Sequence, residues 1–149
     1  MSANTFETIN LAAYSKLHCD AAVSSDSAVL LLRFSGDYRP GSDGNGDGLF
    51  MAAMTAAYCS LFDPTSLVLD LLHLNYRWGN TIARTTNFFW ETGRDDDERS
   101  RSVVIVATGA TRSALESLDR QVTSGTRSYA ESVDRAVELA EAAAREYLA

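Results

Sequence analysis

SLVLDLLHLNYRWGNT, spanning Ser66–Thr81, carries the clearest structural signal in the chain. Its apolar run Leu67–Leu74 contains a single acid, Asp70, and is typical of a parallel strand that is buried on both faces. The segment then becomes polar and reaches Gly79, after which we expect a helix to begin. Because ligands and partners dock at the carboxyl ends of such strands, beside helix N-termini, we expect the functional edge of the molecule here.

Strands and helices alternate on both sides of this segment. We expect strands at Tyr14–Cys19, Ala28–Phe34, Leu67–Leu74 and Ser102–Ala107. We expect helices at Leu49–Phe62, Asn80–Trp90, Thr111–Val122 and Ser128–Leu148. This order predicts an α/β fold with a single mostly parallel β-sheet of β-α-β-α-β-α order, an N-terminal antiparallel strand and a long C-terminal helix. We expect one domain over residues 1–149, with a variable segment at residues 1–25.

The composition argues against several classes of protein. A net charge of −7 is unsuited to the clustered Lys and Arg contacts that phosphates need, so we expect no nucleic acid. No run of about 18 apolar residues occurs and the N-terminus shows no secretory signal, so we expect no membrane partner. Cys19 and Cys59 lie far apart, and we expect a buried thiol at Cys59, no disulfide and a cytoplasmic location. Because no nucleotide or zinc motif occurs, we expect no cofactor.

The expected helix at Leu49–Phe62 is apolar on every side. One of its faces carries Phe50, Met54, Ala57 and Leu61, and its other faces are apolar too. We therefore expect the sheet to cover one side of this helix, and another helix or a second subunit to cover a further side. A homo-oligomeric structural protein is one function that this pattern favours.

Three segments resemble a STAS domain, the fold of anti-sigma-factor antagonists. LLLRFSGD at Leu30–Asp37 resembles the second strand of that family and its "L-S-G-E" turn. VLDLLHLNY at Val68–Tyr76 resembles its "V-L-D-L-S-G-V-x-F" strand without a gap. The segment Val103–Leu118 resembles the next strand and helix, and the final helix resembles the closing helix of the fold. The resemblance implies a non-enzymatic regulatory module that binds a protein partner.

In STAS domains, a Ser or Thr at the start of the helix after the third strand is often phosphorylated. The family has Asp-Ser-Ser or Asp-Ser-Thr there, whereas this chain has Trp78, Gly79 and Asn80, with Thr81 one place later. The sequence therefore departs from the family pattern at the position that carries this regulation.

A rival resemblance is to the crotonase and Clp-type protease superfamily. Those enzymes use backbone N–H groups as an oxyanion hole, and Gly79 lies where such a group would be needed. The segment Gly109–Ser113 resembles the one that carries the nucleophilic serine of Clp-type proteases. This resemblance implies an enzyme, or an inactive remnant of one, that acts on acyl groups with Ser113 or His73 as the reacting group.

We expect a partner-binding surface at the exit of the central strand. Aromatic and arginine side chains dominate binding hot spots, and Tyr76, Arg77 and Trp78 stand together there. The expected surface comprises Tyr76, Arg77, Trp78, Gly79, Asn80 and Thr81, together with Arg112 from the Gly109–Ser113 turn at the same sheet edge. The alternative is that Tyr76 and Trp78 only cover the edge of the sheet.

A second motif, Asp43–Gly48, matches the start of an EF-hand loop. Asp43, Asn45 and Asp47 would be its calcium ligands, but Met54 replaces the glutamate of the twelfth position. We therefore expect a loop that caps the following helix, with a weak Ca²⁺ site as the alternative.

Two polar residues fall inside the expected central strand. We expect His73 to be a structural histidine within that strand rather than a catalytic one. A carboxylate in a buried strand needs a partner, and we expect Asp70 to bond backbone amides or to pair with Arg33 or Arg84.

Overall fold

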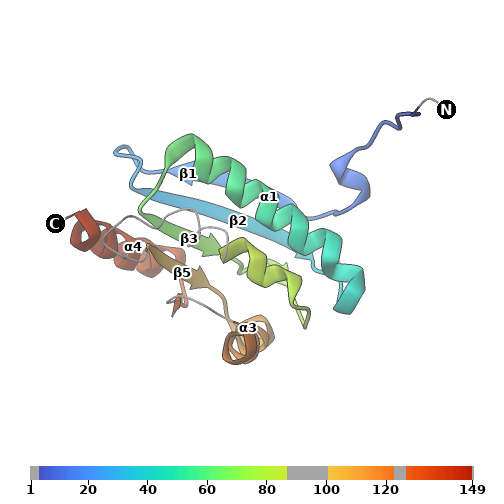
Figure 1. Ribbon diagram of the computed structural model, residues 1–149. Helices are drawn as coiled ribbons and strands as arrows, with labels where there is room; N and C mark the ends of the chain where they lie inside the picture. The colour runs from blue at the N-terminus through green and yellow to red at the C-terminus, as the bar shows by residue number, and fades with distance from the viewer. Residues whose placement is uncertain (1–3, 87–100, 123–126, 149) are drawn as a thin grey trace.

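The computed structural model describes residues 4–86, 101–122 and 127–148 (Figure 1). The strands are β1 (His18–Val23), β2 (Val29–Asp37), β3 (Ser66–Asp70), β4 (Leu74–Asn75), β5 (Ser102–Val106) and β6 (Arg127–Ala130). The helices are α1 (Asn45–Phe62), α3 (Gly109–Val122) and α4 (Val133–Leu148), and the 3₁₀ turns are η1 (Leu11–Ala13), η2 (Gly41–Gly44) and η3 (Thr81–Ala83).

One sheet of six strands organises the fold, in the order β1-β2-β3-β5-β6, and β4 pairs with β2. β1 runs antiparallel to β2, whereas the pairs β2–β3, β3–β5 and β5–β6 are parallel. The predicted α/β class, the mostly parallel sheet, the N-terminal antiparallel strand and the C-terminal helix are therefore confirmed.

Helices cover both faces of the sheet. α1, η3 and α3 pack on one face through residues that include Met51, Ile82 and Leu115. α4 packs on the other face through Ala136 and its other buried alanines, as Figure 1 shows. This arrangement explains why β3 and β5 are buried at nearly every position, since a strand between two helical layers has no solvent face.

Several element boundaries differ from the sequence prediction. The expected strand Tyr14–Cys19 begins later, at His18, and the expected strand Leu67–Leu74 ends at Asp70, where a turn leads to β4. The expected helix Ser128–Leu148 is wrong in its first part, because β6 occupies Arg127–Ala130. Of the expected helix Asn80–Trp90, η3 and helical residues 84–86 are described, and its later part lies outside the described residues.

α1 begins at Asn45, four residues before the predicted start. Its buried residues are Asp47, Gly48, Met51, Thr55 and Cys59. Cys59 is 7% exposed, which confirms the expected buried thiol, and both cysteines are free. This burial raises the pKa of the Cys59 thiol to about 11. The opposite side of α1 is exposed, so the expected cover on a second side of this helix is not supplied by the described residues.

Candidate functional site

The central strand breaks at Asp70, and the break creates the candidate site. The Asp70 carboxylate accepts a hydrogen bond from the Leu72 amide at 3.1 Å and pairs with Arg33 Nε at 2.6 Å, as predicted. The chain then turns, and β4 pairs with the end of β2 through Gly36 opposite Leu74. The residues that follow β4 therefore leave the sheet at the carboxyl ends of its parallel strands.

Tyr76 is buried at the point where the chain leaves the sheet. Its side chain is 1% exposed, its hydroxyl donates to the Gly79 carbonyl at 2.7 Å, and its ring meets Tyr38 edge to face at 5.1 Å. Burial raises the pKa of Tyr76 to about 12. The expectation that Tyr76 offers its ring to a partner is therefore corrected, because the ring is part of the core.

Trp78, in contrast, is 63% exposed. Its ring lies against Gly41, where a Cβ atom would come within 2.6 Å of the indole. Gly41 has a φ of +62°, and its amide donates to the Trp78 carbonyl at 3.4 Å. Glycine at this position thus allows both the left-handed turn and the close approach of the indole.

The residues on either side of Trp78 complete an outward-facing turn. Arg77 is exposed and forms no ion pair with any other residue in the described part of the chain. Asn80 is also exposed, and Gly79 has a φ of +137° that side chains rarely allow. Thr81 is half-buried and donates to Asn45 Oδ1 at 2.7 Å, which ties the turn to the start of α1.

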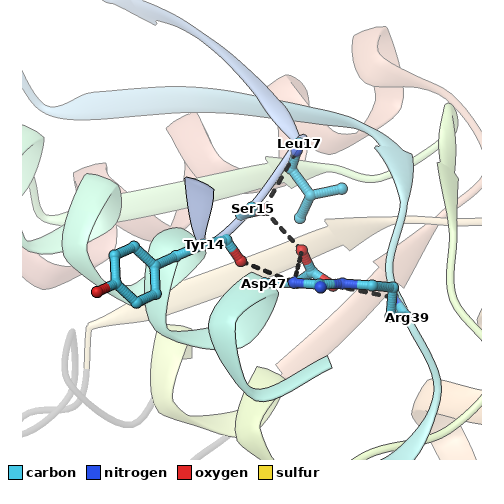
Figure 2. Close-up of polar contacts among 5 residues, drawn as sticks. All are labelled: Tyr14, Ser15, Leu17, Arg39 and Asp47. Carbon is cyan, nitrogen blue, oxygen red and sulfur yellow. Dashed lines mark hydrogen bonds and ion pairs between the residues drawn. The ribbon is translucent and has the colours of Figure 1, made fainter. Parts of the chain in front are cut away.

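The buried carboxylate of Asp47 holds Ser15 and Arg39 in place (Figure 2). Asp47 in the first turn of α1 is 1% exposed, and it accepts hydrogen bonds from Ser15 Oγ at 2.7 Å and from the Arg39 amide at 2.9 Å. Arg39 Nε pairs with the same carboxylate at 3.0 Å, and Arg39 Nη2 donates to the Tyr14 carbonyl at 2.7 Å. The loop that carries Gly41 is therefore fixed at both ends.

The contacts of Asp47 also bear on the expected calcium loop, in which Asp47 would be a ligand. Both carboxylate oxygens point inward to Ser15 and Arg39, and Asn45 accepts the hydrogen bond from Thr81. Within the described residues, no group of three His, Cys, Asp or Glu side chains lies close enough to hold a metal ion. Asp43 lies in η2, and Asn45 and Asp47 lie in the first turn of α1, where their side chains are engaged by other residues of the protein.

The first turn of α3 lies beside the strand exit, as the sequence predicts. Thr111 Oγ1 donates to the Leu74 carbonyl at 3.0 Å and accepts from the Tyr76 amide at 3.5 Å. α3 begins at Gly109, two residues before the predicted start, so Thr111 lies in its first turn. The two turns are joined directly by this one side chain.

Arg112 extends from the same turn of α3. Its Nε pairs with Glu116 at 2.7 Å, and its guanidinium lies 5.4 Å from the centre of the Tyr129 ring. The side chain is 34% exposed, so the guanidinium is oriented by two neighbours while part of it still faces solvent.

The candidate reacting groups of the enzymatic alternative, Ser113 and His73, lie in different elements, α3 and the turn before β4. His73 is exposed in the turn before β4, which corrects the expectation that it lies inside a buried strand. Ser113 donates to the Gly109 carbonyl at 3.2 Å, and no hydrogen bond joins it to His73 among the described residues.

No family model and no curated protein matches the sequence. The structure, however, is similar to the crystal structure of an anti-sigma factor antagonist from Mycobacterium paratuberculosis, with a TM-score of 0.55. The match has 17% sequence identity and covers 85% of this chain and 95% of that one. The chain has a STAS-like fold. The likeness supports the first of the two sequence resemblances, and it shows the fold alone.

Two parts of the site differ from the sequence prediction. The position of Gly41 beneath Trp78 could not be predicted, because no sequence pattern links residues 37 positions apart. Tyr76 is buried rather than part of the surface, and a signal for this is present in the sequence. Leu74 and Tyr76 alternate with the polar Asn75 and Arg77, and this period of two places Tyr76 on the inner side of the chain.

Proposed function

We propose that this chain is a non-enzymatic regulatory module that binds a protein partner through the strand-exit surface, defined as Arg77, Trp78, Gly79, Asn80, Thr81 and Arg112. The observation that carries the proposal is the exposed indole of Trp78, which rests on a loop held by buried hydrogen bonds. An exposed tryptophan on a fixed support loses little conformational entropy when it binds, and such residues dominate interface energies.

The charges around Trp78 favour an acidic contact on the partner. Arg77 faces solvent, and Arg112 presents part of its guanidinium from the adjoining turn. Arg112 is also paired with Glu116, so of these two arginines Arg77 is the cation that has no ion pair among the described residues. Their planar guanidinium groups suit carboxylates, which they bind with two parallel hydrogen bonds.

The partner class that we propose is an anti-sigma factor. This follows from the likeness to an anti-sigma factor antagonist, together with the position of the strand-exit surface at the carboxyl ends of the sheet. The module would act in the cytoplasm, where its two free cysteines remain reduced.

Binding to the anti-sigma factors of the source organism tests the proposal. We expect titration calorimetry to show one complex, and Trp78→Ala to weaken it by about 2 kcal/mol, or roughly 30-fold. Arg77→Ala should weaken binding less and should reduce its dependence on salt. Leu148→Ala is the matched control, because it removes a similarly exposed apolar side chain from α4.

Two results would contradict the proposal at different points. Unchanged affinity of the folded Trp78→Ala, Arg77→Ala double variant would show that the complex uses another surface. Binding to none of the anti-sigma factors would rule out the partner class.

A further inference from the structure

The outer side of α1 is an apolar surface that no other described element covers. Leu49, Ala53, Ala57 and Leu61 recur at every fourth position on this side, and all four are exposed. Leu61 is 74% exposed, and the segment Leu49–Phe62 contains no charged residue. A helix of a monomeric protein normally places charged or polar residues on its solvent side.

The N-terminal arm, residues 4–14, is a second place where large apolar side chains are exposed. Phe6, Ile9, Leu11 and Tyr14 are all exposed, and Phe6 is 96% exposed. The arm leaves the body of the protein beside the first turn of α1, where Ser15 and the Tyr14 carbonyl are held by Asp47 and Arg39. From there it extends away from the sheet, as Figure 1 shows.

We propose that two copies of this chain associate through antiparallel α1 helices, and that the arm of each copy covers the C-terminal end of α1 in the other. An antiparallel pair places Leu49 of one copy against Leu61 of the other, and Ala53 against Ala57. The small alanines in the middle allow the two helices to approach closely, while the leucines close the contact at both ends.

The position of the arm favours exchange between copies. The arm begins next to Asp47, and Leu61 of the same helix is about 21 Å away at 1.5 Å per residue. In an antiparallel pair, the C-terminal end of the other α1 lies directly beside the start of the arm. Phe6 and Ile9 would then cover Leu61 and Phe62 of the second copy.

The available area suits a dimer, and the outer side of α1 carries no charge that would oppose one. Each exposed aromatic side chain offers about 150–250 Å², so the arm and the outer side of α1 together offer on the order of the 800 Å² per partner of a standard interface. A net charge of −7 on each copy opposes association in general. The uncharged outer side of α1 is a place where two copies can meet without facing that repulsion.

Sedimentation velocity of the full chain over a range of concentrations tests the helix pairing. We expect the wild-type protein to form a dimer, and Leu61→Glu or Leu49→Lys alone to weaken the dimer at least 10-fold. An equimolar mixture of the two variants should restore a dimer, because the antiparallel arrangement brings positions 61 and 49 together. Leu148→Glu, at an equally exposed position on α4, should leave the dimer unchanged.

The outcomes separate the parts of the inference. A wild-type protein that stays monomeric at the highest attainable concentration overturns the inference. A mixture of variants that stays monomeric overturns the antiparallel pairing. Circular dichroism of each variant shows that loss of the dimer is not loss of the fold, since both positions are solvent-exposed.

A photo-reactive amino acid in place of Phe6 tests the arm. We expect cross-links to peptides from the last turn of α1, in a product with the mass of two chains on a denaturing gel. Cross-links confined to a single chain would overturn the exchange of arms. As an independent measure, Phe6→Ser combined with Ile9→Ser should weaken the wild-type dimer several-fold.

Discussion

Asp47 shows how a single buried charge can organise a distant surface. Its carboxylate accepts hydrogen bonds from Ser15, from the Arg39 amide and from the Arg39 guanidinium. Asp47→Asn keeps the shape but turns an amide N–H₂ toward these donors, and we expect a loss of about 2 kcal/mol in the free energy of unfolding. Urea denaturation measures this loss, and Asp43→Asn at an exposed neighbouring position should show almost none.

The same carboxylate makes stability depend on pH. Burial acts to raise the pKa of Asp47, but the hydrogen bonds from Arg39 and Ser15 outweigh it, so that the pKa is lowered. A lowered pKa means that this stabilisation is fully present above the ordinary value of about 3.9 and is lost as the pH falls below it. We therefore expect the free energy of unfolding to fall less for Asp47→Asn than for the wild type as the pH falls from about 5 to about 2. An equal fall in the two proteins would contradict this role of Asp47.

The residues around Trp78 show what could be predicted from the sequence at this scale. The pattern of aromatic and arginine residues identified the strand exit, and Thr111 joins it to α3 at the predicted edge. The distinction between the buried Tyr76 and the exposed Trp78 depends on tertiary contacts. Tyr38 and Gly79 hold the Tyr76 ring, whereas Gly41 leaves room for the indole to lie outside.

At the scale of elements, β6 depends on a side chain of α3. Asp119 accepts hydrogen bonds from Arg127 and from the Tyr129 hydroxyl, each at 2.5 Å. Burial acts to lower the pKa of Arg127 and to raise that of Tyr129. A four-residue strand at the edge of a sheet makes few ladder bonds of its own, so this carboxylate is an important part of its attachment.

We expect Asp119→Ala to lower the free energy of unfolding by about 3 kcal/mol, because it removes a partner of a nearly buried guanidinium. Amide hydrogen exchange should locate the effect: the variant should exchange faster than the wild type at Ser128–Ala130, with a smaller change in β3. Glu116→Ala is the matched control on the same helix, since its exposed pair with Arg112 is worth less than about 1 kcal/mol. Uniformly faster exchange throughout the sheet would contradict a local role.

The elements that the sequence predicted best are those with continuous apolar runs. β3 and β5 are buried at nearly every position, so their composition alone identifies them. β6 was missed because RSYA has no such run and only Ala130 in it is buried. The first turn of α1 was read as a loop because its glycines are turn residues, and their place in a helix depends on close contacts such as that of Gly48 with Thr81.

At the scale of the whole molecule, β3 and β5 join two separate packing layers. Val103 and Ile105 of β5 point toward α1 and α3, whereas Val104 and Val106 point toward α4. The same alternation occurs in β3, where Val68 belongs to the α4 side. Neither layer can therefore lose its strands without exposing the other.

We expect this shared sheet to make unfolding a single cooperative event. Met51→Ala on the α1 side and Val104→Ala on the α4 side each remove a fully buried side chain, and each should cost about 2–4 kcal/mol. Both should shift one common urea transition, in which far-UV and near-UV circular dichroism change together. If the far-UV and near-UV signals of either variant instead changed at different urea concentrations, one helical layer would be unfolding while the other stayed packed. The strands would then not couple the two faces as their alternating side chains require.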